Sequence, residues 1–77
     1  MGIIFDLDQT IIDSSIANEK RYARDWRGVY DLIPNMRPYS EIVDFIKLAV
    51  NRGVKVAIVT SSPRTYCEKV LDFLGIT

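Results

Sequence analysis

Residues 2–10 constrain the fold more than any other stretch, because an apolar run in them ends in two carboxylates and a hydroxyl. Residues 3–5 are β-branched or aromatic, which suits a strand that is buried on both faces. Two carboxylates inside such a strand would be costly to desolvate without a cation or hydrogen-bond donors. We therefore expect Asp6 and Asp8 at the carboxyl end of the strand, where open α/β sheets bind their ligands. Residues two apart in extended backbone point the same way, so both carboxylates are expected to face one pocket.

A second apolar run, residues 54–59, ends in the hydroxyl residues Thr60, Ser61 and Ser62. The run is almost wholly apolar and predicts a second buried strand, parallel to the first. A Thr60 hydroxyl at the end of that strand can donate to a phosphoryl oxygen. The amides of Ser61 and Ser62 can join it, because the start of a helix favours anions. The alternative is that these three residues only cap the helix that follows.

The sequence between the two strands predicts short helices first. Ser14 or Ser15 is a suitable N-cap for the first of them. Apolar residues at helical spacing continue to residue 33, either as one helix or as two, with Asp25 capping the second. Pro34 ends this helical region. The expected buried face holds Tyr22, Trp26, Val29, Tyr30 and Ile33.

Two longer helices are predicted further along the chain. The first has Ser40 as its N-cap and Gly53 just beyond its end. The second follows a cap at Ser61 or Ser62, with a proline in its first turn, and ends at Gly75. The expected inward faces hold Ile42, Phe45, Ile46, Ala49 and Val50 in the first helix and Cys67, Val70, Leu71 and Leu74 in the second. Strand, helices, strand and helix in this order predict an α/β fold with a right-handed crossover.

The two strand ends resemble the first two motifs of the haloacid-dehalogenase-like (HAD) superfamily. Residues 5–10, Phe-Asp-Leu-Asp-Gln-Thr, are similar to its hydrophobic Asp-x-Asp-x-Thr motif, and residues 54–62 are similar to its hydrophobic strand ending in Thr or Ser. The Lys of the third motif and the acidic pair of the fourth have no counterpart in residues 1–77. The resemblance therefore implies a single partial domain, the N-terminal half of an HAD-like, Rossmann-type parallel sheet with flanking helices. Residues 11–38 would form a short helical flap or cap.

The same resemblance implies a Mg²⁺-dependent phosphohydrolase that acts through an aspartyl-phosphate. It makes Asp6 the nucleophile and Asp8 the general acid and base, and it assigns phosphate binding to Thr60 with Ser61. The metal ligands that it implies are the Asp6 carboxylate and the Asp8 backbone carbonyl, since Mg²⁺ prefers oxygen and offsets the repulsion between an anion and a phosphate. An aspartate at position 8 indicates a phosphatase or a phosphomutase, with a phosphorylated small molecule as substrate.

Other interpretations of these residues stay open. Asp-x-Asp is also common in surface turns, and a manganese-binding Asp-x-Asp of a sugar transferase lacks other support. An EF-hand starting at Asp6 does not fit, because its positions six and twelve are Ile11 and Ala17 instead of Gly and Glu. A truncated, non-catalytic fragment that binds or self-associates is the alternative function. The basic residues Lys20, Arg21, Arg24 and Arg27 are expected to form a solvated helical face rather than a site for a phosphorylated or nucleic-acid ligand.

Composition sets the remaining expectations. Ten acidic and ten basic residues cancel, so bulk charge favours neither nucleic acid nor an anionic membrane as partner. The one cysteine, Cys67, excludes an internal disulfide. No signal peptide and no apolar run of membrane-spanning length is found, so a soluble cytoplasmic protein is expected. Two strands alone would leave open edges and bare apolar faces, and we expect copies to associate through strand pairing.

Overall fold

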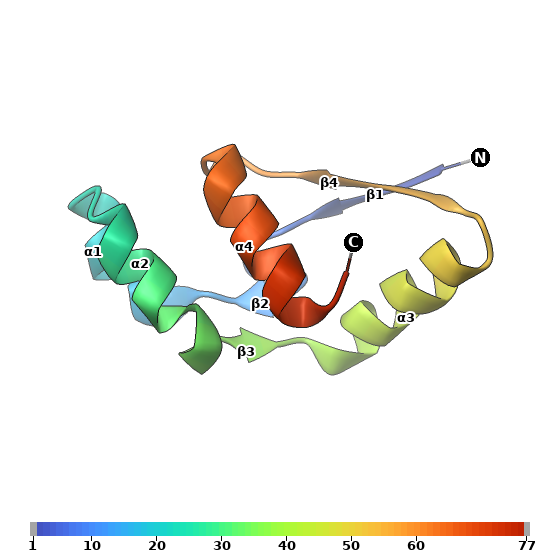
Figure 1. Cartoon of the computed structure of the whole chain (residues 1–77), viewed down its shortest axis with the longest axis horizontal. Coiled ribbons are helices and arrows are strands. Elements are labelled where there is room, and N and C mark those ends of the chain that lie inside the picture. Colours follow the sequence, from blue (N-terminus) through green and yellow to red (C-terminus); the bar gives the residue numbers. More distant parts are fainter. Residues whose placement is uncertain (1, 77) are drawn as a thin grey trace.

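A parallel pair of strands lies at the centre of the fold (Figure 1), seen in a computed structural model that describes residues 2–76. Strand β1 (Gly2–Asp6) pairs with β4 (Lys55–Val59), and the register places Asp6 opposite Val59. Because the strands are parallel, their carboxyl ends meet at one edge of the sheet. Asp6 and Thr60, the residue after β4, therefore lie at the same edge. The predicted α/β class and the parallel pairing are confirmed.

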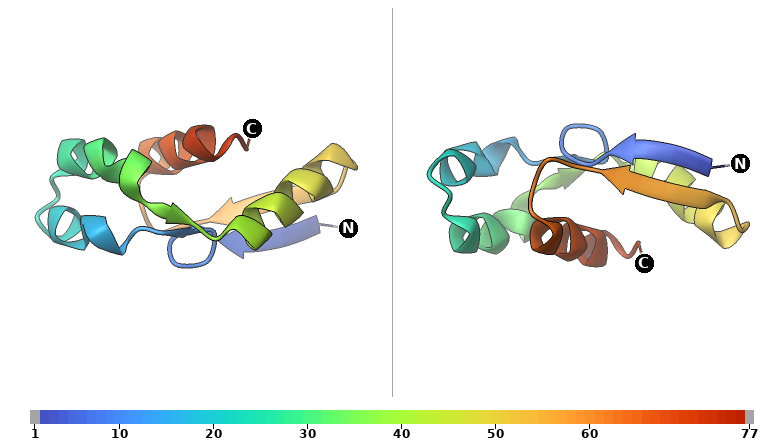
Figure 2. Two further views of the ribbon diagram at one scale, coloured as in Figure 1. Left: turned by 90° about the horizontal axis from the view of Figure 1, so that it is seen from below. Right: turned by 90° about the horizontal axis from the view of Figure 1, so that it is seen from above.

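The 11–38 segment forms a second, smaller layer beside this sheet. Strand β2 (Ile12–Asp13) pairs antiparallel with β3 (Arg37–Pro38), which ties the two ends of the segment together. Between these strands come η1 (Ser15–Ala17), α1 (Asn18–Tyr22), α2 (Trp26–Leu32) and η2 (Ile33–Asn35). The pair α1 and α2 lies at the end of the molecule away from the amino terminus of β1 (Figures 1 and 2). Of the two alternatives, one helix or two, the structure has two, and the Asp25 cap of the second is confirmed, since Asp25 accepts a 3.0 Å hydrogen bond from the amide of Gly28.

Helices α3 (Ser40–Asn51) and α4 (Arg64–Leu74) are the two longer helices. Their predicted ends are confirmed, because Gly53 and Gly75 adopt left-handed backbone with φ of 80° and 75°. Their predicted starts are wrong. The N-caps are Tyr39 and Pro63, and neither makes a side-chain capping bond.

The hydroxyls predicted to cap helices bind elsewhere or lie inside the helix. Ser62 and Ser14 both donate their hydroxyls to Asp8. The turn η1 that begins after Ser14 has no side-chain cap. Ser40 is the first residue of α3, and the amide of Tyr39 before it donates to the carbonyl of Ile11, which anchors the helix start to the smaller layer. Tertiary contacts thus decide where these hydroxyls bind.

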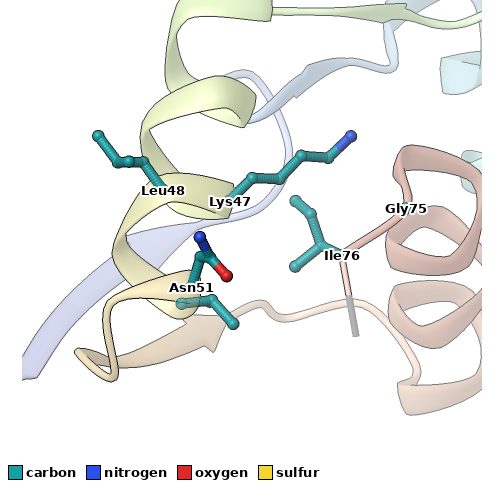
Figure 3. Close-up of a pocket in the computed structure, with 6 residues that line it drawn as sticks. Lys47, Leu48, Asn51, Gly75 and Ile76 are labelled. Carbon is teal, nitrogen blue, oxygen red and sulfur yellow. The ribbon is translucent and has the colours of Figure 1, made fainter.

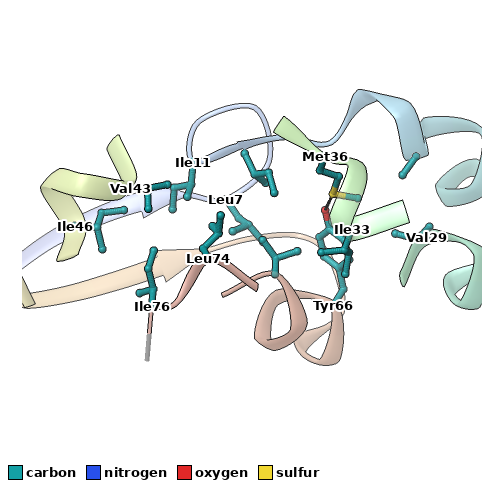
Figure 4. Close-up of a cluster of buried hydrophobic side chains, with 13 residues drawn as sticks. Leu7, Ile11, Val29, Ile33, Met36, Val43, Ile46, Tyr66, Leu74 and Ile76 are labelled. Atoms are coloured by element: carbon teal, nitrogen blue, oxygen red, sulfur yellow. Dashed lines mark hydrogen bonds between the residues drawn. The ribbon is translucent and has the colours of Figure 1, made fainter. Parts of the chain in front are cut away.

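A single core joins both layers and both long helices (Figure 4). Its buried residues are Leu7, Ile11, Ile12, Ala17, Val29, Ile33, Met36, Val43, Ile46, Tyr66, Val70, Leu74 and Ile76. Phe5, Val56 and Ile58 of the strands pack against this cluster. The opposite face of the sheet is bare, with Ile4 71% and Val59 57% exposed. The prediction of strands buried on both faces is therefore wrong, because α3 and α4 cover the same side.

The predicted inward faces of the helices are only partly correct. In α3 the buried stripe runs through Val43, Ile46 and Ala49, whereas Phe45 is 48% exposed. This helix is apolar on more than one side, so its pattern allowed two stripes and the fold covers only one. Tyr22 is 86% exposed because the chain turns between α1 and α2.

Candidate active site

A tight loop follows β1 and separates the two aspartates. The carbonyl of Leu7 accepts hydrogen bonds from the amides of Ile11 at 3.0 Å and Ile12 at 3.3 Å. Gln9 adopts left-handed backbone with φ of 63°, which costs a residue with a Cβ roughly 1–2 kcal/mol. The chain therefore leaves extended geometry directly after β1. The predicted arrangement, in which Asp6 and Asp8 point the same way as alternate residues of a strand, does not form.

Asp6 ends β1 and is exposed. Its Oδ1 accepts a 2.8 Å hydrogen bond from the amide of Leu7. Within residues 2–76, no donor is found for its Oδ2. This carboxylate is thus oriented by the backbone through one oxygen and can meet a ligand with the other.

Asp8 lies at the centre of a polar cluster. Its side chain is 18% exposed and accepts five hydrogen bonds from four residues of the loop, α1, the turn after β4 and α4. The donors are Arg21 Nη1 at 2.8 Å and Nη2 at 3.2 Å, Ser14 Oγ at 2.8 Å, Ser62 Oγ at 3.2 Å and Tyr66 Oη at 2.8 Å. We call Asp8, Ser14, Arg21, Ser62 and Tyr66 the Asp8 cluster. It joins segments that lie far apart in the sequence.

Proton affinities in the Asp8 cluster follow from these contacts. Burial alone would raise the pKa of Asp8, but hydrogen bonds from Arg21, Ser14 and Tyr66 and the Arg21 charge together hold that pKa below its ordinary value. Burial and the bond to Asp8 raise the pKa of Tyr66 well above its ordinary value. The bond to Asp8 raises the pKa of Arg21 although burial opposes it. At neutral pH the cluster therefore contains an ionised carboxylate, a guanidinium and a protonated phenol.

Thr60 lies at the end of β4, beside the tip of β1. Its Oγ1 accepts a 3.1 Å hydrogen bond from the amide of Ser62, which leaves the hydroxyl proton of Thr60 free to be donated. Ser61 between them is exposed. The amide of Ser62, predicted to join a phosphate site, is thus already bound by Thr60, whereas Thr60 and Ser61 are placed as predicted after the strand.

A groove runs from Thr60 and Ser62 along β4 and α4. Its lining residues are Val56, Ile58, Val59, Thr60, Ser62, Arg64, Cys67, Glu68 and Leu71. A second groove lies near the far end of the strands, between α3 and the turn after α4, and is lined by Lys47, Leu48, Val50, Asn51, Gly75 and Ile76 (Figure 3). A third is lined by Gln9, Thr10 and residues 38–42. Neither Asp6 nor Asp8 lines any of them, but only the first groove includes residues of the predicted site.

The metal-binding capacity of this edge is small. Among the residues that the structure describes, no group of three or more Asp, Glu, Cys or His side chains is placed to hold a metal ion. Both oxygens of the Asp8 carboxylate already accept hydrogen bonds. What the chain offers to a hard cation is the Asp6 carboxylate and backbone oxygen, which suits Mg²⁺ only if water and substrate supply the other ligands.

Arg21, Ser14 and Tyr66 are the site residues that sequence reasoning did not find. The basic stretch around Arg21 was expected to be solvated, yet the side chain of Arg21 is 20% exposed and binds Asp8. Tyr66 has one visible signal, because Tyr66, Val70 and Leu74 recur every four residues and mark an inward helical face.

The parallel strand pair, the Asp-x-Asp loop and the hydroxyl turn together define an HAD-like phosphatase, which confirms the resemblance drawn from the sequence. The sequence model of one family, NLI interacting factor-like phosphatase, matches residues 1–77, and the chain belongs to that family. No curated protein and no solved structure matches the chain.

Proposed function

We propose that the chain forms the nucleophile side of a Mg²⁺-dependent phosphohydrolase, with Asp6 as the nucleophile. The observation that carries this proposal is the placement of Asp6 and Thr60 at the ends of two neighbouring parallel strands. An exposed carboxylate and a free hydroxyl donor side by side suit attack on a phosphate group and binding of its oxygens. Membership in a phosphatase family supports the same reaction class.

The proposed reaction has two steps. An oxygen of Asp6 attacks phosphorus, the bond from phosphorus to the leaving oxygen breaks, and Asp8 gives its proton to that oxygen. Asp8 then takes a proton from a water molecule, which attacks the aspartyl-phosphate and releases Asp6 and inorganic phosphate. Thr60 and the amide of Ser61 hold the phosphoryl oxygens. Transfer to a sugar hydroxyl instead of water, as in a phosphomutase, would use the same residues.

Asp8 does not start the proposed reaction in its proton-donating form. Its low pKa and five hydrogen bonds keep the carboxylate ionised in the Asp8 cluster. Proton donation thus requires that the contacts of Asp8 loosen when substrate binds and that its carboxylate then takes up a proton from solvent before the first step. Arg21 makes two of the five contacts, and its hydrogen bonds lower the pKa of Asp8 more than those of any other donor.

The Asp6 carboxylate and the backbone carbonyl of Asp8 would hold Mg²⁺. The side chain of Asp8 is not a suitable ligand, because its oxygens already bind Arg21, Ser14, Ser62 and Tyr66. When bound, the ion offsets the charge repulsion between a carboxylate and a phosphate monoester. Water and phosphate oxygens would complete its coordination.

The substrate that we propose is a phosphorylated small molecule, with residues 11–38 as a flap. In support, the flap reaches the site through Arg21 of α1. Between residues 2 and 76, no helix is both long and apolar enough to cross a membrane. A cytoplasmic location stays a prediction that rests on the single cysteine, Cys67. Burial raises the pKa of the Cys67 thiol.

The test is hydrolysis of an aryl phosphate in the presence of Mg²⁺. The protein should release phosphate, and Asp6→Asn should abolish turnover while the chain stays folded. Ser15→Ala is a control, because Ser15 is exposed and lies outside the Asp8 cluster. Phosphate binding without hydrolysis would instead favour the alternative, a non-catalytic binding module.

A further inference from the structure

Arg21 has one contact that the proposed reaction does not explain. Its Nη2 donates to Ser62 Oγ at 2.7 Å as well as to Asp8 Oδ2 at 3.2 Å. Ser62 lines the groove that contains Thr60, and the amide of Ser62 binds the Thr60 hydroxyl. The Arg21 guanidinium is therefore connected through Ser62 to Thr60, where a phosphate is proposed to bind.

The contacts of Arg21 make it able to change partner. Its Nη atoms bind Asp8, Ser14 and Ser62, and its charge lies 5.3 Å from the centre of the Tyr66 ring. If Arg21 turned away from Asp8, the hydroxyls of Ser14, Ser62 and Tyr66 would still donate to that carboxylate. Asp8 would thus keep three donors. Its loss of Arg21 would not leave a buried charge without partners, which would be the costly outcome.

A phosphate group competes well for such a guanidinium. It carries up to two negative charges, and Arg binds phosphate with two parallel hydrogen bonds as it binds a carboxylate. Arg21 comes from α1, a five-residue helix in a segment whose neighbouring Tyr22 is 86% exposed, so its side chain is not locked into the main core. Because Nη2 of Arg21 already lies 2.7 Å from Ser62 Oγ, the guanidinium needs to move only a little to exchange Asp8 for a phosphate at Thr60.

We propose that Arg21 is a phosphate-binding residue that is shared between Asp8 and the substrate. In the free protein it pairs with Asp8, and a phosphate held by Thr60 and the amide of Ser61 takes the guanidinium over. The flap then joins the substrate site, and Asp8 keeps only neutral donors. This inference rests on the proposed function, since it assumes that phosphate binds at Thr60.

The first test is binding of inorganic phosphate to the 77-residue chain, measured by titration calorimetry. Arg21→Gln should weaken binding about tenfold or more, the loss expected for a charge-assisted hydrogen bond. Arg27→Gln is the matched control, because Arg27 is an exposed arginine in the adjacent helix α2, and its change should stay below about twofold. Circular dichroism on each variant shows whether the chain is folded. Equal phosphate binding by Arg21→Gln and the unchanged chain, or no binding by the unchanged chain, would overturn the inference.

The second test asks whether Asp8 and phosphate compete for the same arginine. Asp8→Asn should tighten phosphate binding when Arg21 is present. In the Arg21→Gln background the same change should give a much smaller gain, since only the removal of charge repulsion remains. Equal gains in both backgrounds would mean that Arg21 is not shared and would overturn the inference. Failure here leaves the role of Asp6 intact, because that role is tested separately by aryl phosphate hydrolysis.

Discussion

The hydroxyl of Tyr66, in the first turn of α4, donates a 2.8 Å hydrogen bond to Oδ1 of Asp8, 58 residues earlier in the chain. The same side chain is fully buried, and its ring lies 5.8 Å from that of Trp26 in α2. Tyr66 thus joins the loop after β1, the flap and α4 through one residue. The hydroxyl of Tyr66 binds Asp8 and its ring packs against Trp26, so both parts of the side chain hold these segments together.

Replacing Tyr66 by Phe should separate these two parts. Tyr66→Phe keeps the ring and removes one donor from Asp8, so we expect a loss of about 1–2 kcal/mol in the free energy of unfolding. Tyr66→Ala also removes the buried ring, and about 3–5 kcal/mol should be lost. Urea denaturation measures both values. Tyr22→Phe is the control, because Tyr22 is 86% exposed, and a Tyr66→Phe variant as stable as this control would contradict the prediction.

Mg²⁺ should bind the 77-residue chain only weakly. At the edge where β1 and β4 end, the described residues offer one free carboxylate, that of Asp6, and backbone oxygen, and no group of three or more ligand side chains is found among them. Mg²⁺ also gives up its water molecules reluctantly. Asp6→Asn should remove what binding there is, whereas Asp8→Asn should leave more of it, since only the backbone of Asp8 is a proposed ligand. Calorimetric titration with MgCl₂ measures this. Micromolar affinity for Mg²⁺ that depends on Asp6 would contradict the prediction, because it would require more protein ligands than Asp6 and backbone oxygen.

The stabilising effect of Asp8 should disappear in acid. Its folded-state pKa lies below its ordinary value, so its contribution is fully present above the unfolded pKa, about 3.9, and is lost as the pH falls through the folded pKa. The protein should therefore be more stable than Asp8→Asn between about pH 5 and 8, and the difference should shrink below about pH 4. Denaturant titrations across this range measure it. Asp31→Asn, at an exposed position of α2, is the control, and a difference between protein and Asp8→Asn that grows in acid would show that the sign is wrong.

The bare face of the sheet should promote self-association. Ile4 and Val59 are 71% and 57% exposed, and each strand of the described sheet has one neighbour only. We expect a dimer or larger species at micromolar concentration, with the sheet continuing between copies. Light scattering gives the mass. Ile4→Lys should shift it toward the monomer, whereas Ile16→Lys, at a residue 51% exposed in η1, should not, and a monomeric unchanged chain would refute the prediction.

The sequence was informative where local rules decide the structure. Asp25 caps α2 and Gly75 ends α4 as predicted, because a cap and a left-handed turn depend on a few neighbouring residues. The apolar runs before Asp6 and Thr60 predicted strands whose pairing is parallel, and this too is confirmed. The placement of Asp6 and Thr60 at one edge of the sheet follows from this parallel pairing alone.

The sequence was uninformative where contacts between distant segments decide. Arg21 lies in a basic stretch with the pattern of a solvated face, and only the folding of α1 onto the loop after β1 brings it to Asp8. Ser14 and Ser62 had the pattern of helix caps, yet a buried carboxylate needs their hydroxyls more than the helix ends do. Exposure of Ile4 depends on which side the helices cover, which the apolar pattern of β1 does not specify.

The wide spacing of the Asp8 cluster also bears on how the chain folds. The contacts of Asp8 span 6 residues to Ser14, 13 to Arg21, 54 to Ser62 and 58 to Tyr66. Loops of the last two lengths are closed at an entropic cost before their contacts can form, and contacts of this kind tend to form late. We expect them to be absent from the folding transition state, so that Tyr66→Phe speeds unfolding and leaves the refolding rate nearly unchanged. A chevron plot of both rates measures this, and slower refolding by Tyr66→Phe would place the cluster in the folding nucleus.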